Sequence, residues 1–566
     1  MELSCTFGSV RLPLGTSCRP RADVALHVTA MARGDRLYHP SNKGGLIMKR
    51  LTVALSLLVV TLLLAGSFAA AQAPRKGGSL VVALGADPEH LNPALTTSYP
   101  VGAVGASVYS GLIWLDEKGR PQPELAESWD ISADGRTYTF HLRRDARWHD
   151  GRPVTSADVK YTMENVLGPY HGRFRNAFAL LEGIDTPDDY TVVLRLREPY
   201  APLMSLLTVF DAPILPKHIY EGSNPLDHPA NYKPVGSGPF VFREWVRGDR
   251  IVLERNPDYF DEPAYIDRLI YRIIPEELSR SVALEIGDVD LVWGLYLPAS
   301  ELPRMMQNPE LEVWQGVRIP SLYFVFVNTR EGALANPKVR QALMHAIDRE
   351  QIVEQAFMGL GNVNVGPFGG GFFWAYDEST DYSKLYPYDP AKARQLLAEA
   401  GVRNLTLRFV YDSARGPFRT AGEIIRDNLR QVGINLQLVP LERSVMVEQV
   451  YTRGAFDLSI QSFTSSGDPI LGYHRIYLTA APGTPFVNAT GYSNPEVDGL
   501  LREAAGVFDF ERRAELYRRA SQILARDLPV LVLFDEVATE VANKRLRGLR
   551  EALDVRDRLE RVWWAE

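Results

Sequence analysis

The stretch PELAESWDISADGRTYTFHLRRDARWHDGRPVTSADVKYTMENVL, from Pro123 to Leu167, carries the pattern that decides the fold. Apolar and polar residues alternate along Arg136–Leu142, which is the period of a half-buried strand. Asp150–Gly151 predicts a tight turn. Thr155, followed three residues later by Asp158, resembles a capping box and predicts a helix to the end of the stretch. These features build a scaffold and none of them supplies reactive chemistry.

The second half of the chain predicts an α/β fold. Leu405–Val410 has the composition of a strand, Ala421–Val432 that of a helix, and Ile434–Leu441 that of a second strand. A strand, a helix and a strand in this order imply a parallel sheet. Further elements expected in the same part of the chain are strands at Tyr323–Asn328 and Phe456–Phe463, and helices from Asn336 to Phe357 and from Asp389 to Gly401.

The opening stretch also resembles the core signature of the bacterial family 5 extracellular solute-binding proteins, the capture subunits of ABC importers for peptides, nickel and related solutes. The resemblance continues in the same order along the chain through PILPKH (213–218), GSGPF (236–240), IVLERNPDYF (251–260), GDVDLV (287–292), VRQALMHAIDRE (339–350), YDPAKARQLLAEAG (388–401) and GYSNPEVDGLL (491–501). Because ligands vary within the family, these motifs do not identify the solute.

The resemblance implies a two-lobed clamshell of the periplasmic binding protein kind (type II-like), with an extra subdomain inserted in lobe I. A ligand would be held between the lobes, and two crossings, near Ile319 and near Leu528, would form the hinge. The implied boundaries are an upstream extension at 1–47, a signal peptide at 48–71, lobe I at 72–111 and 201–318, the inserted subdomain at 112–200, lobe II at 319–527, and a return to lobe I at 528–566.

The N-terminal region is typical of a secretory signal. Lys49 and Arg50 precede an apolar run, Leu51–Ala65, and small residues follow it. An uncleaved membrane anchor is the alternative, but the run is shorter than the roughly 20 apolar residues that a span requires. Ser67 stands where a lipoprotein would carry cysteine, so no lipid anchor is expected. Cleavage is expected after Ala71, with translation beginning at Met48.

Composition excludes several classes of function. The formal net charge of −7 argues against nucleic acid and anionic membranes as partners. Both cysteines, Cys5 and Cys18, precede Met48, so the secreted chain is expected to have no disulfide, thiolate metal site or cysteine nucleophile. The histidines of the secreted chain are scattered singly, and we therefore expect no metal site and no cofactor.

A secreted hydrolase is the alternative from another class. Gly236–Gly238 is one glycine spacing short of a nucleophile elbow, and Pro239 follows it in place of a helix start. Gly359–Gly361 begins a dinucleotide-like pattern, but it follows a helix. Both segments are better interpreted as turns, so no catalytic residue is predicted. A purely structural envelope protein, the third class, would lack ligand-gated closure.

The resemblance places ligand-binding residues in two loops. Thr97, Ser98 and Tyr99 match the early loop that faces the cleft in relatives, and their hydroxyl and aromatic groups suit a polar solute. They equally suit a loop that caps a helix. The loop GPFGGGFFWAYD (366–377) resembles the segment of lobe II that closes over ligand, and its Phe373, Trp374 and Tyr376 offer stacking area, or simply pack the loop.

The tract SFTSSGDPILGYHR (462–475) separates ligand classes. In peptide-binding members an acid that binds the peptide amine lies a few residues before an acid–proline pair. Asp468 matches the later pair as a ligand contact or a turn cap, but Ser465 or Ser466 occupies the position of the amine-binding acid, and Phe463 replaces the usual tryptophan. A serine cannot pair with a buried ammonium as a carboxylate does. Capture of a peptide by its free amine is therefore not expected from this tract.

These observations predict a monomeric, non-lipidated periplasmic binding protein that delivers a small solute to a pair of ABC permeases and catalyses no reaction. Peptides are the first expectation for the solute, oligosaccharides the second, and nickel or another metal chelate the third.

Overall fold

The computed structural model describes residues 74–566, apart from 317–319, 373, 466, 482 and 485. The predictions for the signal peptide and for the segment before Met48 lie outside these residues. So do the predicted crossing residue Ile319 and two of the predicted ligand residues, Phe373 and Ser466.

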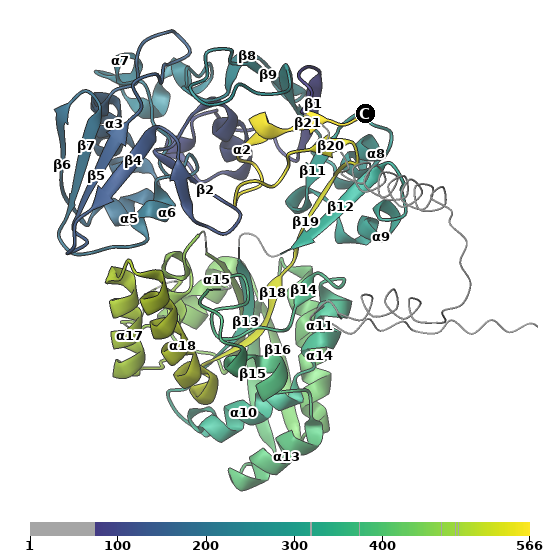
Figure 1. The fold of residues 1–566 in the computed structure, drawn as a ribbon. Helices are drawn as coiled ribbons and strands as arrows, with labels where there is room; N and C mark the ends of the chain where they lie inside the picture. Colours follow the sequence, from purple (N-terminus) through teal and green to yellow (C-terminus); the bar gives the residue numbers. More distant parts are fainter. Residues whose placement is uncertain (1–73, 317–319, 373, 466, 482, 485) are drawn as a thin grey trace, which may run out of the picture. The chain divides into compact units, whose positions relative to one another are not determined.

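The first large sheet has seven strands (Figure 1). Its strand β1 (Ser79–Leu84) pairs in parallel with β10, and Val82 lies opposite Tyr271. In spatial order the sheet contains β12 (Leu311–Gly316), β19 (Ala538–Asn543), β11 (Leu291–Trp293), β1, β10 (Arg268–Ile273), β9 (Arg250–Arg255) and β8 (Phe240–Val246). The sheet therefore joins strands from both ends of the described chain, and we call this part lobe I.

A four-stranded antiparallel sheet packs onto the core of lobe I. It comprises β4 (Ala126–Ile131), β5 (Thr137–Leu142), β7 (Thr191–Leu196) and β6 (Leu181–Asp188), all within the segment predicted as an insertion. The predicted strand is confirmed as β5, whose alternate residues Tyr138, Phe140 and Leu142 are buried. The predicted cap is also confirmed, because the Asp158 carboxylate accepts a hydrogen bond from the Thr155 amide (2.8 Å) at the start of α3 (Ser156–Thr162).

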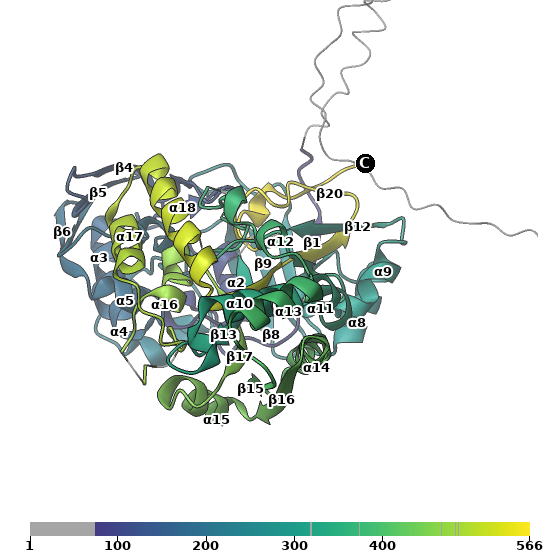
Figure 2. The ribbon, with the colours of Figure 1, turned by 90° about the horizontal axis from the view of Figure 1, so that it is seen from below.

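The second large sheet has six strands and its own core, and we call it lobe II. Its order is β14 (Gly361–Asn362), β18 (Val530–Glu536), β13 (Ser321–Val327), β17 (Leu458–Thr464), β15 (Leu405–Asp412) and β16 (Ile434–Leu441). Strands β15 and β16 are parallel and joined through α14 (Gly416–Gln431), which confirms the predicted strand–helix–strand unit. Figures 1 and 2 show α10 (Pro337–Ala346), α13 (Pro390–Glu399) and α14 against this sheet, with α17 (Pro495–Gly506) and α18 (Phe510–Asp527) beside it.

The helix predicted across residues 336–357 was wrong as a single element. The chain forms α10 and then a separate helix, α11 (Arg349–Ala356). Ile347 between them is extended, and the side chain of Asp348 accepts from the Gln351 amide (2.9 Å) to cap the new helix. A side-chain cap can restart a helix where the apolar period alone indicates no break.

The chain passes between the two large sheets twice. The first passage connects β12 to β13, and the second lies at Val537, between β18 and β19. The predicted return of the chain to lobe I near Leu528 is therefore wrong, because β18 still pairs with β13 of lobe II, with Val532 opposite Phe324. Leu528 instead ends α18. Within the described part of the chain, no helix has the length and apolarity needed to cross a bilayer.

Candidate ligand-binding cavity

A cavity of about 410 Å³ lies between the two lobes. Lobe I contributes the loop before α2 (Tyr99–Val108), the end of β11 and a C-terminal segment, Leu553–Asp557. Lobe II contributes Thr464 at the end of β17 and Glu536 at the end of β18. Val537, where the chain passes between the sheets, also lines it, so the cavity lies at the hinge.

The early loop contributes all three of its predicted ligand residues, Thr97, Ser98 and Tyr99, to the cavity wall. Asn92 shapes this loop, because its side chain accepts from the Ala94 amide (3.0 Å). The Ser98 hydroxyl donates to Glu89 (3.1 Å), so Ser98 does not cap α2 with its side chain. The side-chain cap in this loop is therefore Asn92, at the start of the short turn Pro93–Leu95.

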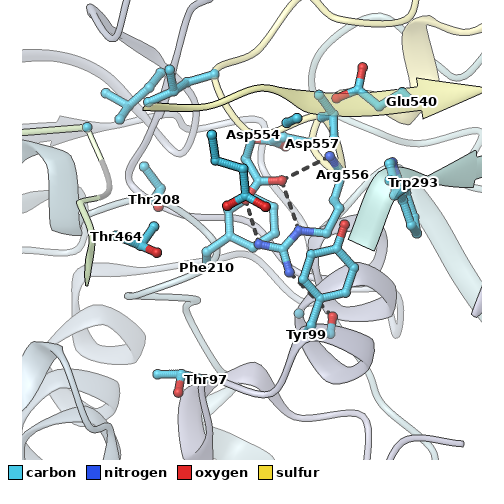
Figure 3. A pocket seen from close by; sticks show the side chains of 18 of the residues that line it. Thr97, Tyr99, Thr208, Phe210, Trp293, Thr464, Glu540, Asp554, Arg556 and Asp557 are labelled. Atoms are coloured by element: carbon cyan, nitrogen blue, oxygen red, sulfur yellow. Dashed lines mark hydrogen bonds and ion pairs between the residues drawn. The ribbon is translucent and has the colours of Figure 1, made fainter. Parts of the chain in front are cut away.

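The centre of the wall is an arginine between two aromatic rings. The Arg556 guanidinium carbon lies 4.2 Å from the centre of the Tyr99 ring and 4.4 Å from that of Phe210. Figure 3 shows these three side chains together. Arg556 donates to both carboxylate oxygens of Asp554, from Nε at 2.9 Å and from Nη2 at 2.5 Å. Burial alone would lower the pKa of Arg556, but the ion pair with Asp554 raises it. The guanidinium therefore stays charged and already has its counter-ion.

Sequence reasoning did not identify this arginine. Arg556 and Tyr99 lie at opposite ends of the chain, and no motif marks the C-terminal segment. The seven-stranded sheet brings them together, because β19 pairs with β11 and the residues that follow β19 pass over the start of α2.

The glycine-rich loop is tied to the hinge strand. The carboxylate of Asp535, on β18, accepts hydrogen bonds from the amides of Gly370 and Gly371. A Cβ at Gly369, which has φ +76°, would lie 2.5 Å from Asp535 Oδ1. Burial raises the pKa of Asp535 to about 7, because only the two glycine amides offset the loss of water. The consecutive glycines thus allow the buried Asp535 carboxylate to approach the backbone amides of the loop closely.

The aromatic residues of this loop mostly pack within lobe II. The centre of the Trp374 ring lies 4.7 Å from that of Phe510 and 5.3 Å from that of Tyr517. It also lines a second cavity, of about 220 Å³, which shares Gly467 and Leu553 with the main cavity. Tyr376 donates to Asp381 (2.9 Å) instead.

The tract 462–475 is largely committed to structure. Phe463 is buried against Phe324 and beneath Arg475, whose guanidinium carbon is 4.2 Å from the ring centre. The Ser465 hydroxyl donates to the Asp468 carbonyl oxygen (2.5 Å). The Asp468 carboxylate accepts from the Ile470 amide (3.0 Å), which makes it the predicted turn cap.

Asp468 has a second role that the sequence did not reveal. Its Oδ2 lies 2.7 Å from Arg513 Nη2, and the exposed fractions of the two side chains are 4% and 8%. The side chains of Arg415 and His474 are likewise engaged within lobe II. Arg415 donates to the Ser462 hydroxyl (2.9 Å), and buried His474, whose pKa is lowered to about 3 by burial, lies 2.7 Å from the Tyr517 hydroxyl.

Two lobes with separate cores, joined by two strand crossings and enclosing a cavity at the hinge, define a clamshell binding protein. The family model for bacterial extracellular solute-binding proteins, family 5, middle region, matches residues 120–483. The chain therefore belongs to this family.

Individual relatives agree with this assignment over most of their length. The chain is 28% identical to the probable D,D-dipeptide-binding periplasmic protein DdpA of Escherichia coli, over 88% of this chain and 96% of the relative. It is 29% identical to heme-binding protein A of Haemophilus influenzae, over 81% and 88%. Its fold matches the periplasmic binding protein DppA of Helicobacter pylori in complex with the peptide STSA, with a TM-score of 0.68, 26% identity, and coverage of 87% and 99%.

Proposed function

We propose that this chain captures short peptides in the periplasm and delivers them to a pair of ABC permease subunits, acting as a monomer and without catalysis. The cavity of about 410 Å³ carries the proposal, because both lobes contribute to its wall at the crossing between them. A ligand that touches both walls stabilises the closed arrangement in proportion to its differential affinity for that arrangement. Closure then gives the permeases a joint surface of both lobes to recognise.

The composition of the wall supports binding without bond making. Among the described residues, the cavity is lined by no histidine, cysteine or lysine. A hydrolase of the serine–histidine or cysteine–histidine kind needs an imidazole beside its nucleophile, and no imidazole lines the described wall. The hydroxyls of Thr97, Thr208 and Thr464, which Figure 3 labels, suit hydrogen bonds to a polar solute.

Peptides are favoured over the other two solutes. The names of the dipeptide-binding relative and of the peptide complex supply the direct support. An oligosaccharide would use stacking faces, but Arg556 occupies one face of Tyr99 and one of Phe210. A nickel chelate would be expected to meet an imidazole, and the described wall has none.

Native mass spectrometry of the protein purified from its own host tests the proposal. We expect a co-purifying mass that fragments as a short peptide, in protein recovered from the periplasmic fraction. A co-purifying sugar or metal complex would contradict the peptide assignment and leave the binding role intact. A peptide added at a hundredfold excess over its dissociation constant should stabilise the protein by about 2.7 kcal/mol.

A further inference from the structure

The charged side chains of the main cavity are almost all paired. Its wall contains two guanidinium groups, and both have carboxylate partners: Arg556 with Asp554, and Arg173 with Asp211 at 2.9 Å. Glu540 pairs with Arg550 at 3.5 Å. Since no lysine lines the described wall, the cavity offers no free positive charge to an anionic solute.

Asp557 lies outside this pairing: its carboxylate accepts a hydrogen bond from the Arg558 amide (3.0 Å), and burial raises its pKa to about 7. Glu536 is the other exception. Its side chain is exposed and lines the cavity, and none of the described residues forms an ion pair or a side-chain hydrogen bond with it. It is the last residue of β18 and directly precedes Val537, where the chain passes between the lobes. The backbone there is held by pairing with Gly361 of β14, which fixes the point from which the side chain extends.

The cavity wall also contains polar atoms that lack partners. Trp293 Nε1 and Thr539 Oγ1 have no hydrogen-bond partner in the described part of the structure, and their side chains are 1% and 4% exposed. Both residues line the cavity. A buried donor without a partner costs free energy, and an indole N–H can only donate. Because these two atoms have almost no accessible surface, they are unsatisfied within the described part of lobe I and do not reach a solute in the cavity.

In the described part of the tract 462–475, the side chains of Ser465 and Asp468 are already engaged. The Ser465 hydroxyl donates to the backbone of Asp468, and the Asp468 carboxylate pairs with Arg513. A cationic group of the ligand must therefore be held elsewhere in the cavity.

We propose that Glu536 binds a positively charged group of the solute, so that this chain selects ligands with an amine or guanidinium. This inference rests on the proposed function and names the ligand class within it. A peptide with a free N-terminal ammonium has such a group. Solutes with only negative charges are disfavoured, because they would meet Glu536 without a compensating cation.

Isothermal calorimetry on the full secreted chain tests the assignment with three probes: trialanine, N-acetyl-trialanine and trialanine amide. Wild-type protein should bind trialanine and its amide alike and lose tenfold or more in affinity for the acetylated form, where a factor of ten corresponds to about 1.4 kcal/mol. Glu536→Gln should bind all three within about threefold of one another, because the partner of the ammonium is gone. Glu127→Gln, an exposed carboxylate on β4 outside the described cavity wall, is the matched control and should keep the wild-type preference.

The outcomes separate the two proposals. A wild-type protein that binds free and acetylated peptide equally, or a Glu536→Gln protein that keeps the preference, would overturn the role of Glu536 while peptide binding stands. If none of the three peptides binds, the peptide assignment fails, and the solute that co-purifies from the host decides the role of Glu536. A cationic solute whose occupancy falls at least tenfold in Glu536→Gln would support it. A neutral or anionic solute, or unchanged occupancy, would overturn it.

Discussion

The Asp468–Arg513 pair gives a sharp test of whether Asp468 binds ligand or holds lobe II together. Asp468→Ala removes the carboxylate that lies 2.7 Å from Arg513 and that also caps the turn at Ile470. Arg513 would remain buried, with a hydrogen bond to the Ala504 carbonyl oxygen (3.1 Å) and the rings of Trp374 at 5.0 Å and Tyr517 at 6.0 Å as its remaining partners. Breaking a buried pair by removing one partner costs about 3–5 kcal/mol, so we expect a loss of unfolding free energy of that size.

A double-mutant cycle isolates the pair from the cap. Urea unfolding of Asp468→Ala, Arg513→Met and the double variant, followed by circular dichroism and tryptophan fluorescence, gives the coupling energy directly. The double variant should be destabilised less than the sum of the singles, by about 1–3 kcal/mol, because no charge is left unpaired. The reasoning is refuted if Asp468→Ala costs less than about 1 kcal/mol and instead weakens peptide binding tenfold or more.

Three further changes probe closure, pH dependence and processing. The Phe508 ring of lobe II lies 5.8 Å from the Tyr138 ring of lobe I, so this contact should help to hold the lobes together. Phe508→Ala should therefore enlarge the radius of gyration of the unliganded protein in small-angle scattering. Equal radii for wild type and variant would contradict this role of Phe508. The pKa of Asp535 is higher in the folded protein than in the unfolded chain, so the free energy of unfolding should fall as the pH rises from roughly 4 to 7, by up to about 1.4 kcal/mol per pH unit. Urea unfolding of Asp535→Asn should show a flatter dependence on pH. Parallel profiles for wild type and variant would exclude Asp535 as the cause. N-terminal sequencing of periplasmic protein should begin at Gln72 or Pro74 without lipid; a chain that retains the residues before Met48 would disprove this processing.

The sequence by itself determined the elements whose signals are local. Three features could be predicted because the signals for strands, helices and caps lie in residues close together in the sequence. They are the alternation along β5, the capping pair of Thr155 and Asp158, and the unit β15–α14–β16. The family motifs extended this to two lobes and placed Thr97, Ser98 and Tyr99 at the cavity.

Only the tertiary structure decided what the charged and buried groups do. Arg556 reaches Tyr99, Asp535 reaches the glycine loop, and Arg513 reaches Asp468, each across a long stretch of chain. Such contacts leave no periodic trace, since they depend on which strands pair and on how closely two backbones approach. The crossing at Val537 was missed for the same reason: Val537 alone separates β18 from β19, and only their partners assign the two strands to different sheets. That crossing places Glu536 in the cavity, so the residue on which ligand selection is proposed to depend is identified by the fold and not by any motif.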